Sequence, residues 1–191
     1  MESNYVVPTG GIPPLTTLGE LLMKKAGLLP KQVGDVNSTA KGSGARYNSG
    51  KAAVDLLPLR SLYDYYQGKS PVGNQRDALA TLAMLALWQE AGLKADLDRA
   101  INAFTLQDWH DCANVFDYGR KKYAEWNWAK GMAWSIPLAC AIRHLMAILE
   151  GEELDPESGL PHKGHVFANI LMILTFIRTF PEGDDRPRYL L

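Results

Sequence analysis

The sequence predicts an all-α protein: an antiparallel helical bundle preceded by an extended N-terminal arm. From Leu56 onward apolar residues recur at helical spacing, for example at Leu59, Leu62, Tyr63 and Tyr66. No stretch of the sequence alternates apolar and polar residues between turn residues, as a half-buried strand would. The 191 residues, of which 47% are hydrophobic and 21% charged, suffice for one well-cored domain.

Residues 1–45 form the predicted arm, because Gly, Pro, Ser and Thr are frequent there. One short helix is expected at 17–26, and its apolar residues could dock on the main body or on a second subunit. Residues 46–180 form the predicted all-α catalytic or binding domain. Residues 181–191 form a polar tail that contains Pro.

The first two helices of the domain follow from apolar stripes. Periodicity predicts a helix over 59–66, and the run 74–91 places Leu79, Leu82 and Ala86 on one face. Gly92 is expected to end this second helix, since Gly adopts the left-handed conformation found at helix C-termini.

A short third helix is predicted over 96–104. Thr105 then has the residue type of an N-cap for a fourth helix that runs through Tyr118, and Gly119 is expected to end or bend it.

The last two helices are the longest apolar segments of the chain. Ser135 is the expected N-cap for a helix over 136–150, in which Pro137 is tolerated in the first turn. A final helix is predicted over 161–180, with Pro161 in its first turn, where a missing N–H does no harm.

Composition limits which classes of partner and which cellular compartment are expected. The net charge of −1 provides no general attraction to duplex nucleic acid or to an anionic membrane, so neither is an expected partner. Cys112 and Cys140 lack metal-binding or redox spacing and are expected to be buried free thiols in a reducing compartment. The apolar run 166–177 is too short to span a bilayer and no basic leader is present, so a cytoplasmic location is predicted.

The junction between the last two helices gathers groups that can do chemistry. His162, His165 and Asn169 share one helix face, and His144 on the preceding helix could return close to His165. The loop before them is acidic, with Glu150, Glu152, Glu153, Asp155 and Glu157.

A divalent metal site is one interpretation of this junction. Imidazoles suit Zn, Mn, Fe or Co, whereas carboxylates suit Mg or Mn. The predicted ligands are Glu152, Asp155, His165 and Asn169. The alternative is a surface or capping role for the histidines and a solvated run of acids, which is the common use of such clusters.

A second cluster combines cations with aromatics. Cations neutralise phosphate oxygens and aromatic faces stack on bases, so the combination suits a nucleotide ligand, although such aromatics also serve simply in packing. A turn at 46–51 ends in Gly-Lys but lacks the spacing of a Walker-type phosphate loop. The predicted substrate-binding residues are Lys51, Lys121, Lys122, Asn127, Trp128, Lys130 and Arg143.

Several short motifs occur together in the chain. They are Gly50-Lys51 with Leu56-Leu57-Pro58; Phe116-x-Tyr118-Gly119-x-Lys121-Lys122-Tyr123 with Asn127-Trp128 and Lys130-Gly131; Arg143-His144-Leu145; Gly151-Glu152 with Asp155 and Ser158-Gly159; and His162-x-x-His165-x-x-x-Asn169. In combination they resemble a phage family of dATP/dGTP diphosphohydrolase-like proteins, which is itself distantly similar to the all-α MazG-type nucleoside triphosphate pyrophosphohydrolases. The resemblance covers the chain from 116 onward, and the Gly-Lys turn separately.

The resemblance implies a metal-dependent enzyme that cleaves a (deoxy)nucleoside triphosphate between the α and β phosphates. The products would be a monophosphate and pyrophosphate. The cofactor would be Mg²⁺ or Mn²⁺, and the protein would help to control phage nucleotide pools. The sequence departs from the family pattern in two ways. MazG-type enzymes hold Mg²⁺ with paired ExxE and ExxD motifs, whereas the last helix here carries His162, His165 and Asn169. Residues 61–104 resemble an insertion that could add a wall to the pocket or an oligomer interface.

The leading hypothesis is therefore a nucleotide pyrophosphohydrolase in the host cytoplasm, working as a homo-oligomer. Glu152 and Asp155 would serve catalysis through the metal, and His144 or His162 could transfer a proton near neutral pH. One rival is a non-catalytic protein that sequesters a nucleotide or a nucleotide signal. Another is a structural protein that assembles through its arm.

Overall fold

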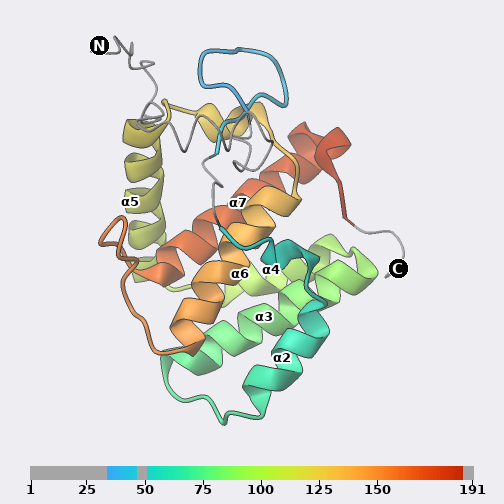
Figure 1. Cartoon of the computed structure of the whole chain (residues 1–191), viewed down its shortest axis with the longest axis vertical. Coiled ribbons are helices and arrows are strands. Elements are labelled where there is room, and N and C mark those ends of the chain that lie inside the picture. The colour runs from blue at the N-terminus through green and yellow to red at the C-terminus, as the bar shows by residue number, and fades with distance from the viewer. Residues whose placement is uncertain (1–33, 47–50, 187–191) are drawn as a thin grey trace, which may run out of the picture.

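The structure, a computed structural model, describes residues 34–46 and 51–186. Within these residues it contains α-helices and short 3-10 helices but no β-strand, and an isolated bridge pairs Leu154 with Pro161 (Figure 1). The all-α prediction is confirmed. The helices are α2 (Leu59–Gln67), α3 (Asn74–Ala91), α4 (Lys94–Asn102), α5 (Leu106–Lys122), α6 (Ser135–Leu149) and α7 (His162–Thr179), with the 3-10 helices η1 (Val54–Leu56), η2 (Asn127–Lys130) and η3 (Pro181–Gly183).

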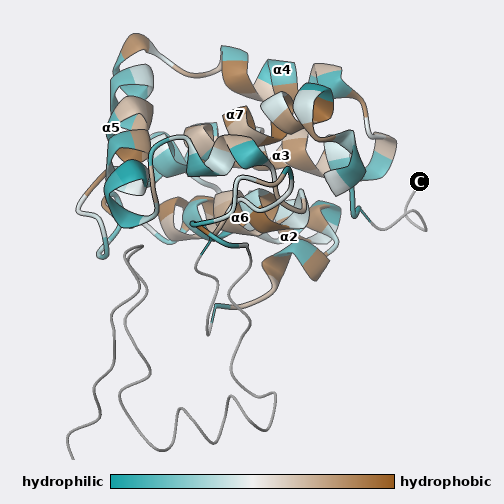
Figure 2. Cartoon of the chain, turned by 90° about the horizontal axis from the view of Figure 1, so that it is seen from above, coloured by the Kyte–Doolittle hydropathy of each residue, from teal (hydrophilic) through white to brown (hydrophobic). Residues whose placement is uncertain are grey.

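Helices α6 and α7 form the centre of the bundle and pack side by side in antiparallel directions (Figure 1). Helix α5 packs against α7, whereas α3 packs against α6 and is flanked by α2 and α4. The core between them is apolar, and Ile142, Leu145, Ile170, Ile173 and Phe176 are almost completely buried. Hydrophobic and hydrophilic residues alternate along α5 in Figure 2, as expected for a helix that packs with one face.

The helix ends show how local sequence sets each boundary. Thr105 begins α5 with a capping box, in which its hydroxyl accepts from the N–H of Asp108 while the Asp108 carboxylate accepts from the N–H of Thr105. Gly92 follows α3 with φ of 69°, the left-handed conformation expected of a C-terminal Gly. Gly119 does not end α5, which continues to Lys122, because one Gly inside a helix is a modest penalty.

Two expected helix starts differ by one residue from the structure. Trp134, not Ser135, is the N-cap of α6, and Ser135 is the first helical residue, with its N–H and hydroxyl bonded to Asp185. Pro161 is the N-cap of α7 rather than part of its first turn. In both cases a neighbouring segment satisfies the helix start, which local sequence does not reveal.

Segments at both ends of the described chain pack against the helices. The N–H groups of Gly42 and Gly44 donate to the carbonyls of Lys130 and Gly131, so residues 34–46 lie against the η2 region. In the tail, the guanidinium of Arg186 lies 4.6 Å from the ring centroid of Trp88. The expected helix at 17–26 lies outside the described residues.

Residues 61–104 complete the core instead of adding a wall to the main cavity. Leu85 and Trp88 of α3 are fully buried and α3 packs against α6. No residue of 61–104 lines the large cavity described below. That this segment is an insertion stays a prediction. Among the helices of residues 34–46 and 51–186, none has both the length and the apolar character needed to cross a bilayer.

Candidate functional site

The acidic loop between α6 and α7 is a closed turn held by its own backbone. The N–H of Asp155 donates to the carbonyl of Leu160 at 2.9 Å, and the N–H of Gly159 donates back to the carbonyl of Asp155 at 2.7 Å. The N–H of His162 donates to the carbonyl of Glu153, which ties the start of α7 to the turn. This geometry brings the end of α6 next to the start of α7.

Three histidines meet at this junction. The Nδ1 atoms of His144 on α6 and His162 on α7 lie 2.8 Å apart, and the ring of His144 stacks on that of His165 with centroids 4.4 Å apart. His162 and His165 are buried, whereas His144 is partly buried. The expected approach of His144 to His165 is present.

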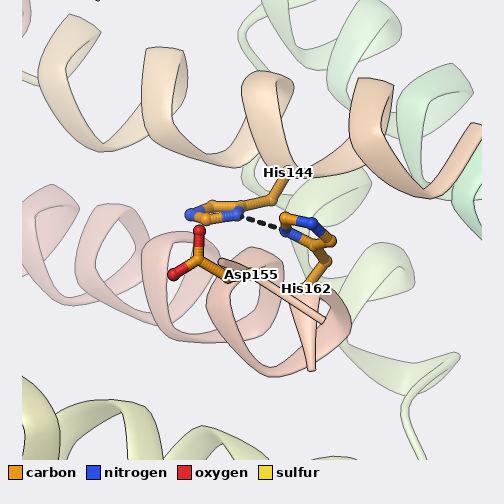
Figure 3. Close-up of side chains that lie close together, drawn as sticks. All are labelled: His144, Asp155 and His162. Atoms are coloured by element: carbon orange, nitrogen blue, oxygen red, sulfur yellow. Dashed lines mark hydrogen bonds between the residues drawn. The ribbon is translucent and has the colours of Figure 1, made fainter. Parts of the chain in front are cut away.

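Asp155 completes a group that could hold a metal ion. Each of His144, Asp155 and His162 offers one ligand atom, and these atoms lie within 4.8 Å of one another (Figure 3). Oδ2 of Asp155 accepts from the N–H of Ser158 at 2.9 Å and from its hydroxyl at 2.7 Å. Figure 3 shows the carboxylate beside the imidazole of His144, so the donors converge from the turn and from two helices.

A cavity of about 760 Å³ opens beside this group, lined by the acidic turn, α5, α6 and the residues Ala45, Arg46 and Lys51. Its volume lies within the range of small-molecule sites. Cationic, acidic and aromatic side chains all line it. The cations are Arg46, Lys51, Arg120, Lys122 and Arg143; the acids are Asp117, Glu125, Asp155 and Glu157; and the aromatics are Phe116, Tyr118, Tyr123, Trp126 and Trp128.

Glu157 connects the acidic turn to the cationic wall. Its carboxylate accepts from the ammonium of Lys122 and from the hydroxyl of Tyr118, and it lies 3.5 Å from Nζ of Lys51. The hydrogen bond from the Lys122 ammonium is the main cause that lowers the pKa of Glu157, and the charge of Lys51 lowers it further. Glu157 is therefore ionised at neutral pH and holds these cations at the cavity.

Arg46 and Arg143 line the cavity, and each is fixed by a hydrogen bond to a different segment. Nη2 of Arg46 donates to Oδ1 of the buried Asn169 at 2.8 Å. Nη1 of Arg143 donates to the carbonyl of Ala52 at 2.8 Å. Two guanidiniums thus face one cavity, an arrangement suited to phosphate oxygens.

Two of the histidines, His144 and His165, are neutral at ordinary pH. Burial is the main cause that lowers the pKa of His144 to about 2, and the nearby His165 and Arg46 lower it further. Burial also lowers the pKa of His165 to about 4, although Asp155 opposes the shift. The prediction that His144 transfers a proton near neutral pH therefore does not fit its environment, because that imidazole stays unprotonated.

The two cysteines are free and buried, as expected, but their surroundings differ. Burial raises the pKa of Cys112 to about 12. Burial also disfavours the thiolate of Cys140, which lines the cavity, but the positive charges of Arg46 and Arg143 outweigh it and lower its pKa. Nη2 of Arg143 lies 3.1 Å from the Cys140 sulfur.

The predicted metal ligands are not all brought together. Glu152 is mostly exposed and lines a different cavity, with its Oε2 3.6 Å from Nε2 of His162. Asn169 is buried and engaged on both ends, since its amide donates to the carbonyl of His165 and its oxygen accepts from Arg46. Of that set, Asp155 belongs to the group near His144 and His162, and His165 lies beside it with Nε2 3.8 Å from Oδ2 of Asp155.

The predicted substrate-binding residues also separate into two groups. Lys51, Lys122, Asn127, Trp128 and Arg143 line the cavity. Lys121 pairs with Asp117 and Lys130 donates to the carbonyl of Val36, so both lie outside its lining. Asn127 contributes in an indirect way, because its carboxamide bonds both the N–H and the carbonyl of Ala45.

Sequence reasoning missed Arg46, Cys140 and Glu157 as site residues. Arg46 precedes the Gly-Lys turn, and its nearness to α7 depends on a contact 123 positions apart. Glu157 belongs to the acidic run, and only the fold of the turn distinguishes it from Glu152. Cys140 lies one helical turn before His144, and this i, i+4 spacing is a signal that could have placed both on one face.

A second cavity of about 360 Å³ lies on the other side of the turn. Its acids include Asp77, Asp108 and Glu152, and Lys163 contacts both Asp77 and Asp108. These contacts link α3, α5 and α7, so the cavity's charged groups have a structural use.

A family model described as dATP/dGTP diphosphohydrolase, N-terminal, matches residues 89–186, just over half of the chain. The dATP/dGTP diphosphohydrolase of Salmonella phage PMBT28 is 27% identical over 96 residues, which make up 50% of this chain and 33% of that protein. The chain thus matches about a third of the length of this relative. No solved structure matches. The family match contains α5, α6, the acidic turn and α7, and on this basis the chain belongs to the dATP/dGTP diphosphohydrolase N-terminal family.

Proposed function

We propose that the chain hydrolyses a (deoxy)nucleoside triphosphate to the monophosphate and pyrophosphate in the cavity between the acidic turn and α5. One observation carries the proposal: a group able to hold a metal, His144, Asp155 and His162, shares this cavity with cationic and aromatic side chains. The name of the phage relative, dATP/dGTP diphosphohydrolase, supports the same substrate class.

A divalent ion is the proposed cofactor, Mg²⁺ or Mn²⁺ by family resemblance. The side chains that would hold it are His144, Asp155 and His162, because their donor atoms converge, whereas Glu152 and Asn169 point elsewhere. When bound, such an ion supplies positive charge that stabilises the phosphate oxygens and favours attack by water. The buried Nε2 of His162, which has no hydrogen-bond partner among the described residues, fits a ring whose orientation a ligand would complete.

The cationic wall would carry the triphosphate. Phosphoryl transfer is catalysed mainly by positioning and by stabilising negative charge, and guanidinium and ammonium groups do both. Arg46 and Arg143 present guanidiniums beside Cys140, and Lys122 and Lys51 present ammonium groups next to Glu157. A triphosphate, with several negative charges, would compete with Glu157 for these lysines.

The aromatic wall would hold the base. Trp126 and Trp128 lie with ring centroids 6.1 Å apart, and the side chain of Trp126 is exposed, so one face is open to a planar ligand. Stacking of this kind accepts any base because every base has a π-face. Trp134, in contrast, packs in the core against Trp88.

The test is product analysis with purified protein. Each dNTP is incubated with Mg²⁺ or Mn²⁺, and pyrophosphate and monophosphate are quantified together. Equal amounts of the two products from at least one dNTP are expected. Release of inorganic phosphate with a diphosphate, or no turnover of any dNTP with either ion, would overturn the proposal.

A second candidate is nucleotide binding without hydrolysis. It is favoured by one finding, that the match covers only a third of the phage relative, so the activity in that protein's name need not reside in the matched region. Calorimetry that detects dNTP binding while no product forms would support this candidate. A homo-oligomeric state and a cytoplasmic location stay predictions.

A further inference from the structure

We infer that this cavity binds a first-row transition ion such as Mn²⁺ in preference to Mg²⁺, held by one ring nitrogen each of His144 and His162 and by a carboxylate oxygen of Asp155. The inference deepens the proposed function and rests on it, since it names the ion of the same site. Its test reads metal binding directly and does not need turnover.

The two imidazole nitrogens are already at a suitable separation. The Nδ1 atoms of His144 and His162 lie 2.8 Å apart. Two imidazoles bound to one ion at about 2.0 to 2.1 Å have nitrogens about 3.0 to 3.4 Å apart. A small rotation of the rings therefore converts their hydrogen bond into shared ligation.

His162 has a second nitrogen that the present contacts leave without a partner. Its Nε2 is buried and makes no hydrogen bond among the described residues, and the nearest carboxylate oxygen, Oε2 of Glu152, is 3.6 Å away. If Nδ1 gives its lone pair to an ion, Nε2 must carry the proton and point it toward Glu152. Histidine ligands of metals commonly donate their other N–H to a carboxylate, which fixes the ring and increases its basicity.

Asp155 is held in place before any ion binds. Ser158 donates its N–H and its hydroxyl to Oδ2 of Asp155, and the turn fixes the Asp155 backbone through Leu160. The hydroxyl of Ser158 is also 2.8 Å from Nε2 of His165, whose ring stacks on His144. The Ser158 hydroxyl thus connects the Asp155 carboxylate to the histidine cluster, so the ligand set is preorganised.

The donor types decide which ion is favoured. Mg²⁺ prefers oxygen ligands in near-octahedral geometry, whereas this set supplies two nitrogens and one carboxylate. Imidazole suits Fe²⁺, Co²⁺ and Zn²⁺, and Mn²⁺, which also takes carboxylate ligands, accepts nitrogen donors more readily than Mg²⁺ does. The inference therefore departs from the all-acid Mg²⁺ sites of the MazG-type enzymes that the sequence resembles.

The experiment titrates chelator-treated full-length protein with Mn²⁺ and follows free Mn²⁺ by electron paramagnetic resonance. One Mn²⁺ per chain is expected, and Mg²⁺ in about 100-fold excess should not displace it. Co²⁺ should add visible absorption bands. The variants His144→Ala, His162→Gln and Asp155→Asn should each weaken Mn²⁺ binding at least about 10-fold. His110→Ala, which removes an exposed histidine of α5 outside the cavity, is the matched control and should leave binding unchanged.

Circular dichroism of each variant separates lost ligands from lost folding, and Asp155→Asn keeps the shape of the side chain if an alanine variant unfolds. Displacement of Mn²⁺ by equimolar Mg²⁺, or undiminished Mn²⁺ binding in folded His144→Ala and Asp155→Asn, would overturn the inference. Hydrolysis supported by Mg²⁺ without measurable Mn²⁺ binding would reject the inference and keep the proposed function. Tight Mn²⁺ binding without hydrolysis would do the reverse.

Discussion

His144 and His162 touch through their Nδ1 atoms, 2.8 Å apart, although they belong to different helices and are 18 positions apart in the chain. The contact exists because the turn at 150–161 reverses the chain, so the end of α6 faces the start of α7. The same reversal places Asp155 beside the pair and Glu157 against α5. A single turn thus joins the histidines to the cationic wall.

Adjacent lysines on α5 provide a matched test of the cavity. Lys122 lines it and contacts Glu157, whereas Lys121 does not line it and pairs with Asp117 at its edge. Lys122→Ala should weaken dNTP binding about 10-fold or more, because a hydrogen bond to a charged group is worth about 1.5 to 3 kcal/mol. Lys121→Ala should change affinity less than about two-fold. Calorimetric titration measures both, and equal losses in the two variants would count against the assignment of the cavity.

The two cysteines should differ in reactivity toward iodoacetamide. Cys140 lines the cavity and has a lowered pKa next to Arg46 and Arg143, whereas burial raises the pKa of Cys112 to about 12. Mass spectrometry should therefore detect alkylation of Cys140 first, since the thiolate is the reactive form. A dNTP should slow that alkylation by occupying the cavity. Faster labelling of Cys112, or no protection at saturating nucleotide, would contradict the expected geometry.

Asp108 should make stability depend on acid pH. Burial alone would raise its pKa, but hydrogen bonds from Thr105 and the ammonium of Lys163, 3.1 Å away, outweigh burial and lower it. Because the folded pKa lies below the unfolded value, ionised Asp108 stabilises the fold at neutral pH. This stabilisation is lost as the pH falls below about 4 and through the folded pKa.

Urea unfolding at pH 7 and at acid pH measures this effect. Asp108→Asn should lower the free energy of unfolding by about 1 to 2 kcal/mol at pH 7, with a smaller difference from wild type at acid pH. Asp98→Asn, which breaks the exposed pair with Lys94, is the control and should cost less than about 0.5 kcal/mol. A difference between Asp108→Asn and wild type that does not change with pH would refute the expectation.

Gly164 should be needed for the close packing of α7 on α5. A Cβ atom there would lie 2.9 Å from the backbone carbonyl carbon of Asp111, which is too close without a shift of one helix. Gly164→Ala should therefore lower the free energy of unfolding by about 1 to 3 kcal/mol. Gly119→Ala is the control, because a Cβ at that helical position meets no described atom within 4 Å, and it should raise stability by about 0.5 to 1 kcal/mol. Thermal melts would show opposite shifts, and a stable Gly164→Ala protein would argue against this packing.

The helices were predictable because their signals are local. The run 74–91 has the same bounds as α3, and the Thr105 cap was identified from residue type alone. The C-terminus of α5 was not predictable, because Gly119 is a residue type that often ends helices, whereas the helix continues to Lys122. Whether Gly ends a helix depends on the conformation of the residues after it, which a single residue type does not decide.

The site was predictable where it depends on helix spacing and not where it depends on distant contacts. The closeness of His144 to His165 follows from an antiparallel return after a short turn. Helix spacing does not show that Asp155, rather than Glu152, lies in the group that could hold a metal. Asp155 is placed there by the hydrogen bonds of Ser158 within the turn. Arg46 reaches the cavity only through contacts with residues more than 80 positions away, so periodicity carries no information about it.

Asn127 helps to hold the N-terminal segment at the edge of the cavity. Its carboxamide accepts from the N–H of Ala45 at 3.1 Å and donates to the Ala45 carbonyl at 2.8 Å, and this bracket fixes the residue next to Arg46. Local opening of a segment held by so few bonds requires far less free energy than global unfolding. Opening of residues 42–46 would break these bonds together with the backbone bonds to Lys130 and Gly131 and the bond from Arg46 to Asn169. It would withdraw a guanidinium from the binding chamber while the helices stay folded.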